Sequence, residues 1–150
     1  MKKIWILITA ILLVVSIALG ISCKMVWEKY ESQTKRIDEL FRGNLLLLSE
    51  NLYEYDKENE FHEWNYENIR YANMCMTLFP LSSYADNQEL STIVSELNLL
   101  SKKGKLSSKI DVSLAEDMAY MCMNIEYEEL IHGVYEQLCE SAADLHMILE

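Results

Sequence analysis

The stretch "IWILITAILLVVSIALGI", residues 4–21, decides the architecture of this chain, because it holds eighteen consecutive residues without a charge. At about 1.5 Å of rise per residue, a helix of this length covers about 27 Å, close to the ~30 Å hydrocarbon core of a bilayer. Lys2 and Lys3 directly precede the run. The sequence therefore predicts that residues 1–22 form a membrane anchor or signal-anchor.

Two other fates of this segment stay open. The small residues of Ala18-Leu19-Gly20 suit a signal peptidase, so the segment also resembles a cleaved signal peptide. Lipid attachment at Cys23 is the third alternative, although Gly20-Ile21-Ser22-Cys23 lacks the branched aliphatic residue expected three positions before the cysteine. We favour an uncleaved anchor, because the run exceeds the ~7–15 apolar residues usual in signal peptides.

Basic residues flank the anchor on both sides, so the positive-inside rule nearly cancels. Two lysines precede it, and four basic residues follow within a short distance: Lys24, Lys29, Lys35 and Arg36. A short basic tail before a signal-like run normally stays inside. We therefore expect the N-terminus in the cytoplasm and residues 23–150 on the extracytoplasmic side of the cell membrane.

The remainder of the chain is strongly acidic. Residues 23–150 keep 11 of the 13 basic residues and all 24 acidic ones, for a net charge of −13. Such a charge favours solubility and disfavours nucleic acid and, beyond the anchor itself, anionic lipid surfaces as partners. Basic proteins, cationic cell-envelope components and divalent cations are compatible with it. We expect no nucleic-acid partner and a membrane or envelope protein as partner, and a homo-oligomer stays open.

Hydrophobic spacing predicts an all-α fold, in which the transmembrane helix continues into a three- to four-helix antiparallel bundle. Apolar residues recur every three or four positions, and alternation typical of strands is absent. We expect a single domain over 23–150 with helices at about 24–57, 60–79, 86–103 and 113–149. The predicted inward stripes are Ile37, Phe41, Leu45, Leu48, Leu52 and Tyr55; Phe61, Trp64, Tyr71, Cys75 and Leu78; Leu90, Ile93, Val94, Leu97 and Leu100; and Tyr120, Met123, Tyr127, Ile131, Val134, Leu138, Ala142, Leu145 and Leu149.

Local signals set the expected helix ends. Pro80 should end the second helix, because proline cannot donate to the helical ladder. Asp86 with Glu89, and Ser113 with Glu116, have the spacing of capping boxes at the starts of the third and fourth helices. Gly104 after two lysines is a stop signal.

The tripeptide Met-Cys-Met occurs twice, centred on Cys75 and Cys122. Neighbouring residues on a helix point about 100° apart, so the three sulfur atoms of one tripeptide cannot converge on a single ion. A shared Cu(I) site would need both cysteines at the same level of two packed helices. We interpret both as core residues, with a Cys75–Cys122 disulfide and a soft-metal site as alternatives.

Glu129 and His132 are the other candidate metal ligands, because residues three apart on a helix project together, as in di-iron carboxylate bundles. Those sites need two such pairs and two further glutamates, and this chain has one pair. The preferred interpretation is a solvated stripe of Glu129, His132 and Glu136.

The acid-rich segment 54–68 also carries Trp64 and Tyr66. We interpret it chiefly as the turn between the first two helices, with Trp64 and Tyr66 as the candidate partner-binding residues. The sequence contains no phosphate-binding loop and no nucleophile elbow, so we expect neither an enzyme nor a bound cofactor.

These patterns predict a single-pass, membrane-anchored helical protein of the cell envelope that acts as a protein–protein interaction or accessory module. Two alternatives remain. One is an extracytoplasmic sensor module that binds a ligand or a soft metal, and the other is a structural spacer that spans the envelope.

Overall fold

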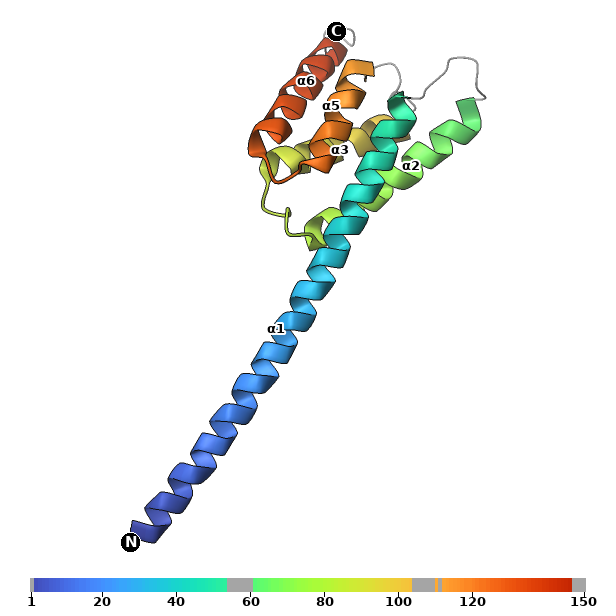
Figure 1. The fold of residues 1–150 in the computed structure, drawn as a ribbon. Coiled ribbons are helices and arrows are strands. Elements are labelled where there is room, and N and C mark those ends of the chain that lie inside the picture. The colour runs from blue at the N-terminus through green and yellow to red at the C-terminus, as the bar shows by residue number, and fades with distance from the viewer. Residues whose placement is uncertain (1, 54–60, 104–109, 111, 147–150) are drawn as a thin grey trace. The chain divides into compact units, whose positions relative to one another are not determined.

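The computed structural model describes residues 2–53, 61–103, 110 and 112–146, and this part of the chain contains helices and turns but no strand. The helices are α1 (Lys2–Tyr53), α2 (Phe61–Leu78), the 3-10 helix η1 (Phe79–Leu81), α3 (Gln88–Lys102), α5 (Val112–Met123) and α6 (Glu128–His146) (Figure 1). The predicted all-α fold is confirmed. Residues 1, 54–60, 104–109, 111 and 147–150, including the predicted stop at Gly104, lie outside the described residues.

The chain divides into two compact units, Met1–Arg36 and Ile37–Glu150. Helix α1 contributes to both, so the boundary lies fourteen residues beyond the predicted end of the anchor at residue 22. By length and composition, α1 is long and apolar enough to cross a membrane, and none of its most apolar window is buried inside the protein.

In the second unit, the described apolar stripe of α1 faces the core as its spacing predicts. Phe41, Leu45 and Leu48 are fully buried, and Leu52 is nearly so. The Phe41 ring lies against Phe79, with centroids 5.8 Å apart, and against Tyr84 at 6.0 Å. This part of α1 is therefore a core element of the bundle.

Helix α2 runs in the opposite direction to the second half of α1 and contacts it at Asn51, and α5 and α6 form an antiparallel pair (Figure 1). Helix α3 contacts both α2 and α6, so it joins the two pairs. A polar contact accompanies each junction. Asn51 donates to Asn68 between α1 and α2, Asn98 donates to Asn73 between α3 and α2, and Gln137 donates to Asp117 between α6 and α5.

The connection between α2 and α3 begins where Pro80 predicts it. Helix α2 ends at Leu78, and Pro80 lies in η1. The start of α3 differs by one residue from the prediction, because the N-cap is Asn87 and not Asp86. The Asn87 side-chain oxygen accepts from the Leu90 amide at 2.9 Å, which satisfies one of the free donors at the helix start.

The predicted single helix over 113–149 is wrong, because the structure has two helices with a break between Met123 and Glu128. The Arg42 guanidinium donates to the carbonyl oxygens of Cys122 and Met123, at 3.1 and 3.0 Å. In an uninterrupted helix these oxygens would accept from backbone amides four residues later. An arginine from α1 thus satisfies carbonyls at the end of α5 and stabilises the break.

The buried side of α5 also differs from the prediction. Tyr120, Met123 and Tyr127, predicted to face inward, are more than half exposed. The core instead receives residues from the next face of the helix and the turn: Leu114, Ala115, Met118, Met121, Cys122 and Ile125. Ser113 lies inside α5 rather than capping it, because the helix already includes Val112. The α6 part of the prediction is confirmed at Ile131, Val134 and Leu138, which are buried.

Candidate functional site

The two Met-Cys-Met tripeptides place their central cysteines in the core. Cys75 of α2 and Cys122 of α5 are buried, and both belong to the single hydrophobic cluster of the second unit. Met74, Met76 and Met123 are exposed, whereas Met121 is fully buried. No tripeptide therefore presents its three sulfur atoms to one point, and each cysteine fills space as an ordinary core residue does.

Burial keeps both thiols protonated at neutral pH. It raises the pKa of Cys75 to about 12. It also raises the pKa of Cys122, and the charge of a Cys75 thiolate would raise it further, while Arg42 opposes the rise. The thiolate, not the thiol, is the nucleophile and the metal ligand. Neither cysteine is therefore suited to nucleophilic attack or metal binding at neutral pH. All four cysteines are free in the structure, so the alternative Cys75–Cys122 disulfide is not formed in it.

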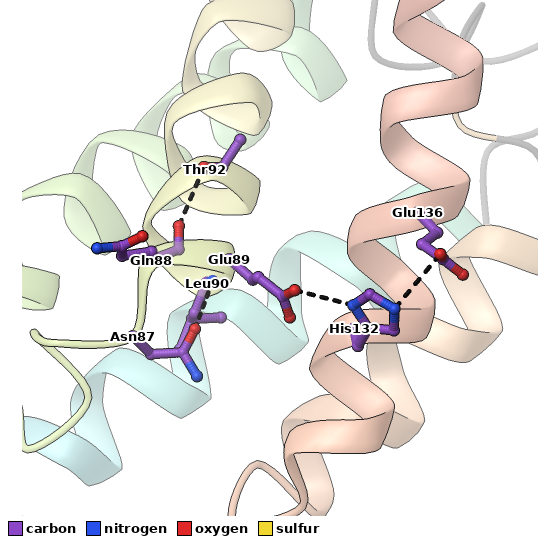
Figure 2. Close-up of polar contacts among 7 residues, drawn as sticks. All are labelled: Asn87, Gln88, Glu89, Leu90, Thr92, His132 and Glu136. Atoms are coloured by element: carbon purple, nitrogen blue, oxygen red, sulfur yellow. Dashed lines mark hydrogen bonds and ion pairs between the residues drawn. The ribbon is translucent and has the colours of Figure 1, made fainter.

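His132 has different partners from the predicted one. Its Nδ1 lies 2.8 Å from Glu89 Oε1 of α3, and its Nε2 lies 3.3 Å from Glu136 Oε1 of α6 (Figure 2). Glu129 is exposed and is not among these partners. The preferred interpretation, a solvated stripe, describes Glu129 and Glu136 well, but it omits the contact from His132 to α3.

The contact between His132 and Glu89 is held in place by the first turn of α3. Figure 2 shows Asn87 capping this turn through Leu90, and the Thr92 hydroxyl donating to the Gln88 carbonyl. Glu89 itself lies beside the positive end of the helix dipole, where a carboxylate is favoured. Glu89 and then Glu136 raise the pKa of His132, because both carboxylates favour the imidazolium form.

Metal binding was the alternative chemistry for Cys75, Cys122, Glu129 and His132. The structure places the two cysteines in the core and the other two residues on the exposed side of α6, so these four candidates do not form one cluster. Within the described ranges, no group of three or more His, Cys, Asp or Glu side chains has a geometry suited to a metal ion.

The candidate partner-binding residues Trp64 and Tyr66 both lie in α2, although the sequence interpretation assigned their segment chiefly to a turn. The Tyr66 side chain is 71% exposed. The Trp64 side chain lies outside the described residues.

Sequence reasoning missed a second exposed apolar group, which we call the α5 stripe: Tyr120 and Met123 of α5, and Tyr127 of the connection to α6. These residues are 55–58% exposed. Their spacing of three and four residues is that of a helical face, but a second apolar stripe at the same spacing, Leu114, Met118, Met121 and Ile125, takes the buried side. That competing stripe was the signal available in the sequence. Comparison of the chain with protein-family models, curated proteins and solved structures returned no match.

Proposed function

We propose that this chain is a single-pass membrane protein of the cell envelope whose helical unit, residues 37–150, binds another membrane or envelope protein. The observation that carries the proposal is the exposure of the apolar residues early in α1. The large side chains between Ile11 and Ile21 are each 48–64% exposed, with no protein cover. A contiguous apolar surface of this kind marks contact with lipid or with another protein.

The second part of the proposal, partner binding, is supported by the surface of the second unit. Its apolar residues mostly enter one core, yet Tyr66 and the α5 stripe stay exposed. Tyrosine and methionine are enriched at protein interfaces, because their side chains supply large contact areas and have few polar groups that need a hydrogen-bond partner. A tether to the membrane would raise the local concentration of this surface near a membrane-bound partner.

Membrane insertion is tested by washing membranes that contain the full-length chain at alkaline pH. We expect the chain to stay with the membrane pellet, and its release into the supernatant would refute the anchor. Protease added outside intact cells should digest residues 23–150. Protection of these residues, while a known exported domain is digested, would refute the extracytoplasmic orientation.

Partner binding is tested by site-specific photo-crosslinking in native membranes, with the crosslinker at Tyr66 or Tyr120. Exposed Glu140 on α6 serves as the matched control position. We expect a discrete heavier adduct from Tyr66 or Tyr120 and none from Glu140. The double variant W64A/Y66A should retain its helicity but yield less co-purified partner. Absence of an adduct at both tyrosines would remove the proposed contact surface.

The soft-metal sensor alternative predicts a different result. Elemental analysis of the purified full-length protein under reducing conditions would show stoichiometric copper, zinc or iron if Cys75, Cys122 or His132 held a metal. The interaction module requires no such metal.

A further inference from the structure

We propose that the membrane-contacting part of α1 extends to Trp27 and Tyr30, and that these two rings lie in the headgroup layer of the lipid bilayer. This inference rests on the proposed membrane anchoring. It goes beyond that proposal because it replaces the anchor boundary at residue 22 and assigns a lipid-binding role to residues 23–30.

The spacing of the tryptophans is the first argument. Trp5 and Trp27 are twenty-two positions apart on one helix and are 69% and 70% exposed. At about 1.5 Å per residue they lie about 33 Å apart along the axis, which matches the ~30 Å hydrocarbon core with one ring at each edge. Tryptophan and tyrosine concentrate at these two edges, because their rings are apolar and their N–H or O–H groups need polar partners.

The segment between Ile21 and Tyr30 is itself apolar on one face. An open hollow in the first unit is lined by Ser22, Cys23, Val26, Trp27 and Tyr30. These positions follow the three- and four-residue steps of one helical face. In water this face would leave two aromatic rings uncovered, whereas acyl chains below and headgroups above would cover both.

Lys24 lies within the extended segment and carries a charge, which opposes a position deep in the hydrocarbon core. Its Nζ lies 3.7 Å from Glu28 Oε1, so this charge is paired with a carboxylate one turn further along the helix. A lysine one turn below the headgroup layer can also reach it by snorkelling. Lys24 is therefore compatible with a membrane edge at Trp27 and Tyr30.

The charges beyond Trp27 fit a phosphate-bearing surface. Beyond Trp27 the helix carries Lys29, Lys35 and Arg36 against Glu28 and Glu31, and Lys35 pairs with Glu31 at 2.8 Å, so a small positive balance remains. On the other side of the span, Lys2 and Lys3 precede Trp5. Lysines at both edges complement lipid phosphates, so the charges favour a lipid headgroup layer as the occupant of the aromatic face.

The test uses the full-length protein in phosphatidylcholine and phosphatidylglycerol vesicles, with variants that keep one tryptophan each. W5F/W64F leaves Trp27, and W27F/W64F leaves Trp5. We expect both fluorophores to be quenched more by lipids with a bromine or spin label near the headgroup than by lipids labelled deep in the chain.

Three outcomes would overturn the inference, and they are distinguishable from one another. If lipid quenches Trp5 but only aqueous acrylamide quenches Trp27, the anchor stands and its edge lies near residue 21. If Trp27 is shielded from both lipid and acrylamide, protein such as a second copy covers the aromatic face. If lipid quenches neither tryptophan, the proposed anchoring fails as well.

Cysteine labelling gives an independent measurement. Cys23 and Cys139 are both exposed in the structure, and Cys139 also lies beside the Tyr135 hydroxyl, so the decisive comparison is with a cysteine on the same helix as Cys23. Cys23 lies about 6 Å below Trp27 along the helix axis. With a membrane-impermeant maleimide, we expect Cys23 to react about tenfold more slowly than Cys139, because thiolate formation is suppressed in lipid.

The matched control is Gln33→Cys in a background of C23S and C139S. Gln33 lies on the same helix beyond Tyr30 and is exposed. Its cysteine should react as fast as Cys139. Equal rates for Cys23 and Gln33→Cys would place Cys23 in water and overturn the inference.

Discussion

Helix α1 contains two apolar regions that have opposite environments. Between Ile11 and Ile21 the large side chains are about half exposed or more, whereas Phe41, Leu45 and Leu48 on the same helix are fully buried. The difference lies in the pattern around the helix. The first region is apolar on all sides, and the second has one apolar stripe beside polar positions such as Asp38 and Arg42.

This contrast shows that the width of the apolar surface on a helix decides whether neighbouring helices can bury it. A single stripe can be covered by neighbouring helices, here through the core of the second unit. A helix that is apolar all round needs cover on every side, which lipid supplies without further protein. A substitution in the first region should therefore affect membrane insertion, whereas one in the second region should affect unfolding of the second unit.

The largest effect is expected for Phe41→Ala in the second region. Removal of this fully buried ring, which packs on Phe79 and Tyr84, should lower the free energy of unfolding by about 3–5 kcal/mol. Urea unfolding of the full-length protein in mild detergent, followed by circular dichroism, measures the change. Leu40→Ala is the matched control, because Leu40 is the neighbouring residue and is 48% exposed. Similar losses for both variants would contradict the assigned core.

The next effect is expected for Val14→Lys in the first region. A lysine at the centre of a membrane helix costs about 2.5–3.5 kcal/mol of insertion free energy, so the membrane-bound fraction should fall sharply while the folded second unit is unchanged. Quantitative fractionation of cells that express the variant measures the effect. Gln33→Lys, beyond the proposed membrane edge, should remain fully membrane-bound. Equal membrane retention for Val14→Lys would show that the first region does not lie in lipid.

Much of this contrast could be predicted from the sequence, because it depends on local periodicity. The steps from Phe41 to Leu45 and Leu48 define a core stripe without knowledge of any partner helix. The break after Met123 could not be predicted in the same way. It depends on Arg42, which is 80 residues before Cys122 in the chain and contacts it only after α1 and α5 have packed.

The candidate site shows the same limit. The burial of Cys75 follows from its position on the α2 stripe with Tyr71 and Leu78. The contact between Glu89 and His132 joins residues 43 positions apart. A sequence pattern shows only neighbours on one helix, so it indicated Glu129, three residues before His132, as the partner instead. Periodicity identifies which face of a helix is apolar, but contacts between helices depend on their packing.

A smaller effect is expected for Arg42→Met, which keeps an apolar stem but removes both hydrogen bonds to the end of α5. Hydrogen bonds from a charged donor are worth about 1.5–3 kcal/mol, and the partly exposed position of Arg42 favours the lower figure. Hydrogen exchange should accelerate most in the turn between Met123 and Glu128. Arg36→Met, an exposed change outside the second unit, should leave this turn unaffected. Protection of the turn that is unchanged in R42M would show that Arg42 does not stabilise the break.

The smallest effect concerns His132, whose side chain is exposed and whose pKa is raised by Glu89 and Glu136. A folded-state pKa above the ordinary value of 6.5 means that the folded protein binds the proton more tightly than the unfolded chain does. The stabilisation is therefore complete below pH 6.5 and disappears as the pH rises through the folded-state pKa. The difference in urea midpoint between the wild type and His132→Gln should follow this course. It should be largest in mild acid and shrink on the alkaline side of pH 6.5.

Glu89→Gln should remove most of the pH dependence, because Glu89 is the partner that raises the pKa most, whereas Glu129→Gln should leave it intact. A difference that is constant with pH, or that grows toward alkaline pH, would show that the imidazolium does not join α3 to α6.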